Sequence, residues 1–252
     1  MISLKSEREL ELMAEGGRIV AATLALVRSA ARPGVSTLEL DELAEAFIRR
    51  HPGATPSFKG LYGFPGTLCT SLNEEIVHGI PSRKRILREG DVLKVDVGVR
   101  FAGLHTDSAT SVAVGEVDAT TRRLMDVTVE ALGAGIASAR AGNHIGDIGA
   151  AVQAVVERGG FSVVRDLVGH GIGEQFHEEP QVPNFGKPKR GTKLVPGLTI
   201  AIEPMVNAGG FKTRTLSDKW TIVTADGSRS AHFEHTVAIT DNGPRILTNG
   251  TG

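Results

Sequence analysis

Two long stretches of the chain carry hydrophobic residues at steps of three and four, which is the spacing of one face of an α-helix. The first runs from Ser6 to Ala30, where Ser6 and Glu9 have the spacing of a capping box, and the second covers residues 120–139. A break containing glycine follows each, and then a shorter stretch of the same kind begins at Ser36 or Thr37 in one case and covers residues 145–157 in the other. The pattern predicts two pairs of helices.

Runs rich in valine and isoleucine follow the helix pairs and predict strands. We expect strands over residues 90–99, 110–114, 161–168, 198–203, 219–225 and 232–240. Residues 54–81 are rich in glycine and aromatic residues, and we expect loops and short strands there.

The second helix pair and its strands repeat the first. Gly34 corresponds to Gly142, and Asp96, near the end of one strand, corresponds to Glu203, at the end of another, an offset of 107 or 108 residues. The sequence therefore predicts one domain over residues 1–252, built from two similar halves at about 6–115 and 120–240. The fold class is α/β in the broad sense (α+β), with the halves related by a pseudo-two-fold axis.

Four acids occupy unusual places in these halves. Asp96 and Glu203 lie in or end hydrophobic strands, while Asp107 and Glu234 each follow a histidine by two residues. Burying a carboxylate costs several kcal/mol unless it is paired, protonated or bound to a metal. A single such acid is readily explained by a lysine or arginine partner, and a duplication with coincidental acids is the alternative for the set.

A pseudo-two-fold arrangement would bring the four acids together at the junction of the halves, where they would repel one another unless cations were present. With His170 they exceed the ligands of a lone zinc and suit two divalent ions, for which Co, Mn, Fe(II) and Zn all remain open. Such a pair of ions holds a bridging water or hydroxide that can attack a carbonyl carbon. The sequence therefore predicts a metal-dependent hydrolase.

Histidines stand near the predicted ligands. His78 opens a His-Gly-Ile tripeptide that recurs at His170, and His177 lies seven residues after His170. A structural hydrogen bond is the ordinary role of a single histidine, but the recurrence favours roles for His78 and His177 in catalysis and substrate binding. We expect structural or supporting roles for His105, His232 and His235.

The composition narrows the class of partner and compartment. Net charge is −1, and lysine and arginine are scattered, so we expect no nucleic acid and no membrane as a partner. One cysteine, Cys69, excludes an internal disulfide and fits a reducing compartment. The charged first ten residues do not form a secretory signal. We expect a cytoplasmic monomer.

The ordered ligands, the Gly-His-Gly-Ile-Gly stretch at 169–173 and the stretch from Cys69 to Pro81 resemble type I methionine aminopeptidase from about Ser6 to Thr240. The resemblance implies the duplicated pita-bread fold around a central curved antiparallel sheet. It also implies removal of the initiator methionine from nascent chains when the second residue is small, with attack of a dimetal-bound hydroxide on the first peptide bond.

The resemblance further implies individual roles. Asp96 is a bidentate ligand of one metal, and Asp107 and Glu234 bridge the two. His170 and Glu203 bind the other metal, and Glu203 also handles the proton of the attacking water. His78 and His177 contact the substrate amide. The implied pocket for the methionine side chain consists of Phe58, Leu61, Phe64, Cys69, Phe176 and Trp220.

Some features differ from the family pattern, and rivals exist. Phe58, Leu61 and Phe64 stand where bacterial relatives often carry cysteine or tyrosine. No zinc-finger or proline-rich extension precedes the first helix, so we expect at most transient proximity to the ribosome.

The rival families are the proline-specific aminopeptidase P and prolidase, which usually have a further N-terminal domain. A creatinase-like enzyme without metal and a metal-free binding domain are the remaining alternatives.

Overall fold

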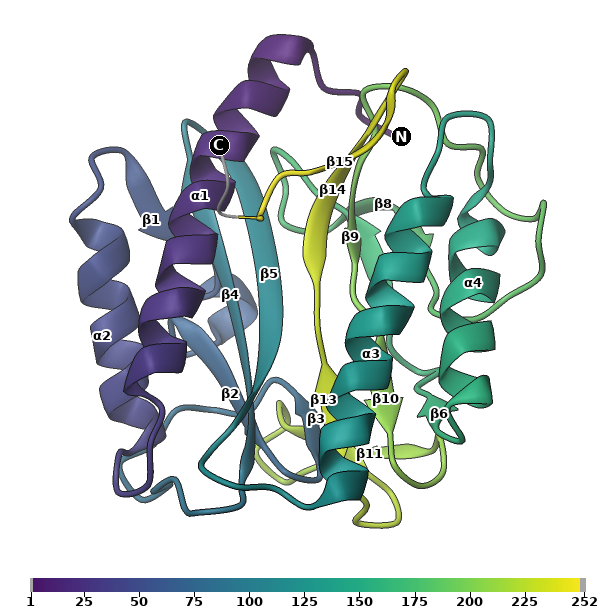
Figure 1. The fold of residues 1–252 in the computed structure, drawn as a ribbon. Helices are drawn as coiled ribbons and strands as arrows, with labels where there is room; N and C mark the ends of the chain where they lie inside the picture. The colour runs from purple at the N-terminus through teal and green to yellow at the C-terminus, as the bar shows by residue number, and fades with distance from the viewer. Residues whose placement is uncertain (1, 250–252) are drawn as a thin grey trace.

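The computed structural model describes residues 2–249, and helices flank a central group of strands (Figure 1). The helices are α1 (Glu7–Ala30), α2 (Thr37–Arg49), α3 (Ala119–Ser138) and α4 (Ile145–Arg158), with a short 3-10 turn, η1 (Leu61–Gly63). Each predicted helix is present, with ends within about one residue of those expected.

Helix starts follow from local hydrogen bonding. Ser6 and Ser36 each accept a bond from the backbone N–H three residues later, and the carboxylates of Glu9 and Glu39 accept one from the backbone N–H of the cap residue, so both are capping boxes. Asp118 caps α3 by accepting from Thr121 N. The cap predicted at Ser6 is confirmed.

The strands of the first half are few and long. They are β1 (Ala54–Pro56), β2 (Leu68–Leu72), β3 (Glu75–Val77), β4 (Val92–Phe101) and β5 (Leu104–Ala113). β4 is antiparallel to β1, β2 and β5, and it pairs with β5 over ten residues on each side of the turn at Ala102 and Gly103.

The strands of the second half are shorter. They are β6 (Ser162–Val163), β7 (Gly169–Gly171), β8 (Glu178–Val182), β9 (Thr199–Ile202), β10 (Met205–Asn207), β11 (Thr213–Thr215), β12 (Ile222–Thr224), β13 (Ser230–His232), β14 (His235–Thr240) and β15 (Gly243–Ile246). One antiparallel sheet has the order β15-β14-β9-β7-β8, while β13-β10-β6 and β11-β12-β3 form two others.

Three strand predictions need correction. Asp107 lies within β5, which begins at Leu104 rather than at residue 110, because the β4–β5 turn is tighter than expected. Of residues 161–168 only Ser162 and Val163 form a strand, through pairing with β10. The expected strand 232–240 is interrupted at Phe233 and Glu234, where Glu234 N donates to Ala109 O of the other half instead of continuing a ladder.

The same backbone hydrogen bonds recur in both halves. Gly34 N donates to Leu87 O, and Gly142 N donates to Leu194 O, each at 2.9 Å. The chain also forms isolated bridges between Ser36 and Ile86 and between His144 and Lys193. These contacts tie the start of the second helix in each pair to the segment before the acid-bearing strand.

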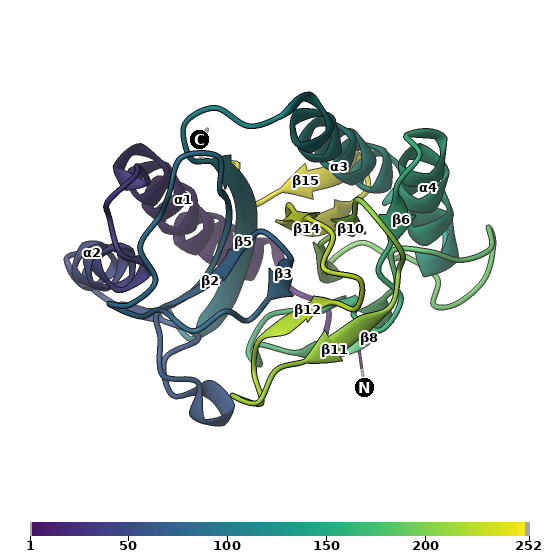
Figure 2. The same cartoon turned by 90° about the horizontal axis from the view of Figure 1, so that it is seen from below.

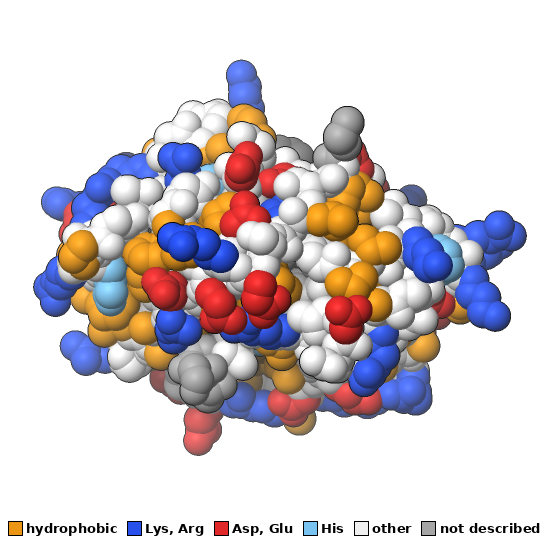
Figure 3. All heavy atoms as spheres, turned by 90° about the horizontal axis from the view of Figure 1, so that it is seen from above, with side chains coloured by type: hydrophobic (Ala, Val, Ile, Leu, Met, Phe, Trp, Pro, Cys, Tyr) orange, Lys and Arg blue, Asp and Glu red, His pale blue; other side chains and the backbone are white. Residues whose placement is uncertain are grey.

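The halves meet along β5 and β14. Thr236 Oγ1 donates to Asp107 O at 2.8 Å and accepts from Asp107 N at 3.0 Å, while Ser108 Oγ donates to Glu234 O. Figure 2 shows the four helices on one side of these strands, with β11 and β12 on the other. The face seen from above carries mixed charged and hydrophobic side chains (Figure 3).

Each half has its own hydrophobic core. Val20, Leu40 and Val95 belong to the cluster beneath α1 and α2, whereas Ile148, Ile200 and Val237 belong to the one beneath α3 and α4. The predicted duplicated fold around antiparallel sheets is confirmed. The single domain range of 1–252 stays a prediction, and its residue 1 and residues 250–252 lie outside the described residues.

Candidate active site and metal centre

The four predicted acids converge at the junction of the halves. Asp96 and Asp107 lie on the paired strands β4 and β5, where Asp96 is opposite Ala109 and Asp107 is opposite Gly98. Glu203 directly follows β9, and Glu234 directly precedes β14. The first half therefore contributes acids from inside strands, and the second half contributes them from strand ends.

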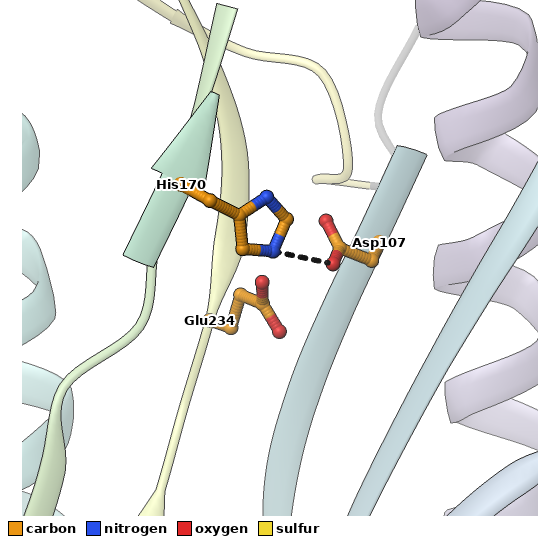
Figure 4. Close-up of side chains that lie close together, drawn as sticks. All are labelled: Asp107, His170 and Glu234. Atoms are coloured by element: carbon orange, nitrogen blue, oxygen red, sulfur yellow. Dashed lines mark ion pairs between the residues drawn. The ribbon is translucent and has the colours of Figure 1, made fainter. Parts of the chain in front are cut away.

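His170 of β7 points into this group of acids. Its Nε2 lies 3.7 Å from Asp107 Oδ2 and 3.8 Å from Glu203 Oε1. Ligand atoms of Asp107, His170 and Glu234 all lie within 4.8 Å of one another (Figure 4). His170 Nδ1 is 2.8 Å from Gly171 O, which can only accept, so Nδ1 carries the proton and the lone pair of Nε2 faces the carboxylates.

Burial strongly disfavours charge on the acids. It raises the pKa of Asp96 well above its usual range, with a further contribution from the Asp107 charge. Burial likewise raises the pKa of Asp107 to about 6, and those of Glu203 and Glu234 well above the ordinary value. Burial lowers the pKa of His170 to about 4, so the imidazole is neutral near pH 7 and does not offset the acids. A bound cation would offset the negative charge of the acids.

The donor atoms fit divalent cations. Within residues 2–249, Asp96 Oδ1 and Glu234 Oε1 are buried without a hydrogen-bond partner. Buried carboxylate oxygens without partners are costly, and a metal ion satisfies them. Four carboxylates and one neutral imidazole in this arrangement match the oxygen-rich donor sets of Mn, Fe, Co and Zn.

His78 and His177 both line the same cavity as the acids. Burial lowers the pKa of each to about 4, with a further lowering of the His78 pKa by His177 and of the His177 pKa by His170. The His177 ring lies 4.5 Å from the His170 ring and is stacked on Tyr62 at 5.9 Å. His78 adopts a left-handed backbone with φ of 61°, a conformation uncommon for residues other than glycine. Neutral imidazoles beside the acids can donate hydrogen bonds to a substrate amide.

The cavity has a volume of about 570 Å³ and is lined by every residue predicted for the site. Phe58 and Phe176 pack edge to face at 5.2 Å, as do Phe64 and Trp220 at 5.1 Å. Burial raises the pKa of the Cys69 thiol well above its usual range, so this residue is a neutral part of the wall. Leu61 completes the predicted set. The cavity wall therefore combines the acids and histidines with a cluster of aromatic rings.

Sequence reasoning missed several residues of the cavity. Tyr62, Val77, Leu167 and Met205 also line it. Met205 could have been found, since it lies two residues after the predicted ligand Glu203 and side chains two apart on an extended chain share a face. Tyr62 carried no such signal, because its place over His177 depends on its left-handed φ of 51°.

His232, predicted to be structural, lies 1% exposed behind the acids. Its Nε2 is 3.7 Å from Glu203 Oε2, and burial lowers its pKa to about 3. This distance is too long for a hydrogen bond, so the buried ring packs beside the Glu203 carboxylate without bonding to it.

Residues 11–241 match the metallopeptidase family M24. The chain belongs to this family. It is 52% identical over 248 residues to the methionine aminopeptidase of Clostridium perfringens, with 98% of this chain and 99% of the relative covered. Methionine aminopeptidase 1 of Bacillus subtilis is 50% identical over the same lengths. The predicted resemblance to methionine aminopeptidases is confirmed, and with it the prediction of a metal-dependent aminopeptidase.

Solved structures agree with this placement in family M24. The methionine aminopeptidase of Thermotoga maritima superposes with a TM-score of 0.96 at 43% identity, covering 98% of this chain and 99% of that one. The prolidase of Pyrococcus furiosus has a TM-score of 0.76 at 21% identity over 65% of its own length, which shows a shared fold. Among residues 2–249 no helix is long and hydrophobic enough to span a membrane.

Proposed function

We propose that the protein removes the N-terminal methionine from nascent polypeptides whose second residue is small. The observation that carries the proposal is that four acids and His170 line the same cavity as a group of aromatic side chains, called here the aromatic recess. The high identity to methionine aminopeptidases over the full length of the relatives supports the same activity.

Asp96, Asp107, His170, Glu203 and Glu234 would hold two divalent ions. When bound, such ions lower the pKa of water and polarise the carbonyl of the bond to be cut. Asp107 and Glu234 would be the residues shared by the two ions, and the closeness of their ligand atoms, within 4.8 Å of each other and of His170, supports this role. Glu203 has the role of taking up the proton of the attacking water, because its pKa is raised and its carboxylate faces His170.

His78 and His177 would position the substrate. With pKa values near 4 they are neutral at physiological pH, so each can donate one N–H to the carbonyl or accept the amide N–H of the scissile bond. They stabilise charge that develops on the amide without an ionised side chain of their own.

The aromatic recess suits a methionine side chain. Phe58, Phe64, Phe176 and Trp220 present ring edges and faces, which attract a polarisable thioether sulfur. Leu61 and the neutral thiol of Cys69 add apolar surface. A charged first residue would lose its hydration there without a counter-ion.

A cytoplasmic location follows from the same proposal, since nascent chains are the substrate, and one buried free cysteine fits a reducing compartment. A monomer with only transient proximity to the ribosome remains our expectation.

The decisive test uses enzyme stripped of metal by a chelator and then supplied with Mn, Co, Fe(II) or Zn. Met-Ala-Ser and Ala-Pro-Ala peptides are offered separately. Release of methionine from the first peptide only, and only with metal, is expected. Cleavage of the Ala-Pro peptide would assign a proline-specific activity, and no cleavage with any metal would overturn the proposal.

The number of ions has its own measurement. Titration calorimetry on the stripped enzyme is expected to give two ions per chain, with the second bound more weakly as charge accumulates. Binding of a single ion at saturation would contradict the bridging roles of Asp107 and Glu234.

A further inference from the structure

A buried ion pair far from the acids in sequence holds the loop that carries His177. Lys5 precedes α1, and its Nζ lies 2.5 Å from Oε2 of Glu178, the first residue of β8. The two side chains are only 2% and 9% exposed. Ion pairs on protein surfaces contribute little, whereas a buried pair strongly constrains both partners, because either charge left alone is costly.

Both ends of this pair are anchored. Lys5 N donates to Gly197 O at 2.7 Å, just before β9, and Nζ also donates to Ser3 O. Glu178 uses its other oxygen, Oε1, to accept from Gln175 N at 3.1 Å. The carboxylate therefore connects the N-terminal segment to the backbone of the loop.

The loop between β7 and β8 contains the residues that the proposed function needs. Phe176 and His177 lie between Gln175 and Glu178, the two residues joined by that hydrogen bond. Gly173 also supports the loop, since its O accepts from His105 N and its N donates to Gln175 O, and the Phe176 ring packs against Phe58 and His105.

Gly173 packs directly on the lysine. A Cβ added to it would overlap Cε and Nζ of Lys5 and press on Glu178 Oε1. The loop and the ammonium group therefore occupy one tightly packed space, and displacement of either moves the other.

Hydrogen bonds do little to hold the His177 side chain, because its one polar contact within residues 2–249 is Tyr62 OH at 3.5 Å from Nδ1, and Tyr62 is itself 73% exposed. Its ring also packs against the rings of His170 at 4.5 Å and Phe176 at 4.8 Å. Phe176 belongs to the same loop, so the orientation of the imidazole depends on where the loop backbone places both rings. We propose that Lys5 is a positioning residue for His177, acting through Glu178, an inference that rests on the proposed function of His177.

The test compares Lys5→Met, which removes the ammonium but keeps the length of the side chain, with Arg245→Met. Arg245 of β15 pairs with Glu11 of α1 at 2.6 Å, but that pair is exposed and far from the loop in sequence. With Met-Ala-Ser as substrate, kcat of Lys5→Met is expected to fall about tenfold to a hundredfold, as small misplacements of catalytic groups do. Metal content should be unchanged, and kcat of Arg245→Met should stay within about twofold of the parent.

A double-mutant cycle separates positioning from general destabilisation. In the His177→Ala background, Lys5→Met should have no further effect on kcat, because the group it positions is gone. An equal loss in both backgrounds, loss of metal, or a wild-type kcat for Lys5→Met would each overturn the inference. Should Lys5→Met not fold, Glu178→Gln takes its place, with the same expectations.

A measurement that does not depend on catalysis tests the anchoring of the loop separately from the proposed function. Amide hydrogen exchange of Gly173 and Gln175 should be at least about tenfold faster in Lys5→Met than in Arg245→Met, because the carboxylate that accepts from Gln175 loses its partner. If the parent enzyme cut no methionine peptide while this exchange increased, the proposed function would fail and the anchoring of the loop by Lys5 would stand. Unchanged exchange overturns the anchoring.

Discussion

The two halves of the molecule supply equivalent acids from differently built strands. In the first half, β4 and β5 pair over ten residues, and both acids lie inside this ladder. In the second half, β9 and β14 pair over only four residues, and both acids lie just beyond it. The first half uses short aspartates on a rigid ladder, whereas the second uses glutamates, whose extra methylene lets them reach the centre from irregular backbone.

The repeated His-Gly-Ile tripeptide shows the same divergence. His170 lies in β7 with its Nε2 among the acids, while His78 follows β3 in a left-handed conformation and lies elsewhere in the cavity wall. In the proposed function, one copy of the tripeptide supplies a metal ligand and the other a substrate contact. The two copies have the same sequence, and the local backbone sets where each histidine lies.

The largest effects are expected from the acids themselves. Asp96→Asn and Glu203→Gln each remove one negative ligand, one from each half, and each should lower kcat/KM by more than the roughly hundredfold that loss of a supporting group costs. Activity assays with metal analysis provide the check. Activity close to the parent in either variant, with metal still bound, would rule out that ligand.

The next largest effects are expected from the two histidines of the repeated tripeptide, and they should differ in kind. His170→Ala is expected to weaken metal binding, because the imidazole is the one nitrogen ligand. His78→Ala should instead lower kcat about a hundredfold, as removal of a single stabilising donor does, with metal content intact. Kinetics and metal titration on both variants decide, and loss of metal from His78→Ala would remove the distinction between the halves.

A smaller effect is expected on the pH dependence of folding stability, where His105 can be compared with its counterpart His232. Burial lowers their pKa values to about 4 and about 3 in the folded protein, so the unfolded chain, with histidine pKa near 6.5, binds more protons below that pH. Stability from these groups is therefore complete above pH 6.5 and is lost as pH falls toward 4. For the partly exposed His105 the loss is about 1–2 kcal/mol after solvent screening.

The measurement is the free energy of unfolding of chelator-treated protein between pH 6.5 and 4.5. His105→Gln and His232→Gln should each flatten the decline, with the larger change for the fully buried His232. The buried acids have raised pKa values, so their contribution to stability changes with pH in the opposite direction. Each variant is therefore compared with its parent, which has the same acids. A slope unchanged by His232→Gln would contradict its burial as a neutral ring.

The smallest effect concerns Gly98, whose counterpart in the second half is Met205. A Cβ at Gly98 would lie 2.8 Å from Phe176 and 3.0 Å from Phe58. Gly98→Ala should push these rings into the recess and raise KM for methionine peptides about threefold to tenfold with little change in kcat. Gly133→Ala, which meets no atom within 4 Å, is the control. An unchanged KM would show that the recess has room to spare.

The parts of the fold that sequence predicts best are those governed by local periodicity. The four helices follow from apolar spacing and from caps such as Ser6 and Ser36. The candidate acids were picked out because acids in valine-rich strands are unusual enough to stand out, and the structure brings them to one cavity. Strand limits in the second half were missed, since Glu234 leaves the ladder to bond Ala109 across the junction. Such tertiary contacts have no local signature.

The hydrogen bonds between β5 and β14 have a consequence for how the protein acquires its structure. Thr236 and Asp107 are 129 residues apart, and Ser108 and Glu234 are 126 apart. Contacts so distant in sequence form late, because a long loop must close before they stabilise anything. The first half is synthesised before the second, and at that stage it contains two of the acids but no functioning metal centre. Metal affinity should therefore appear only once the C-terminal half is complete, which makes metal uptake a report on the final step of folding.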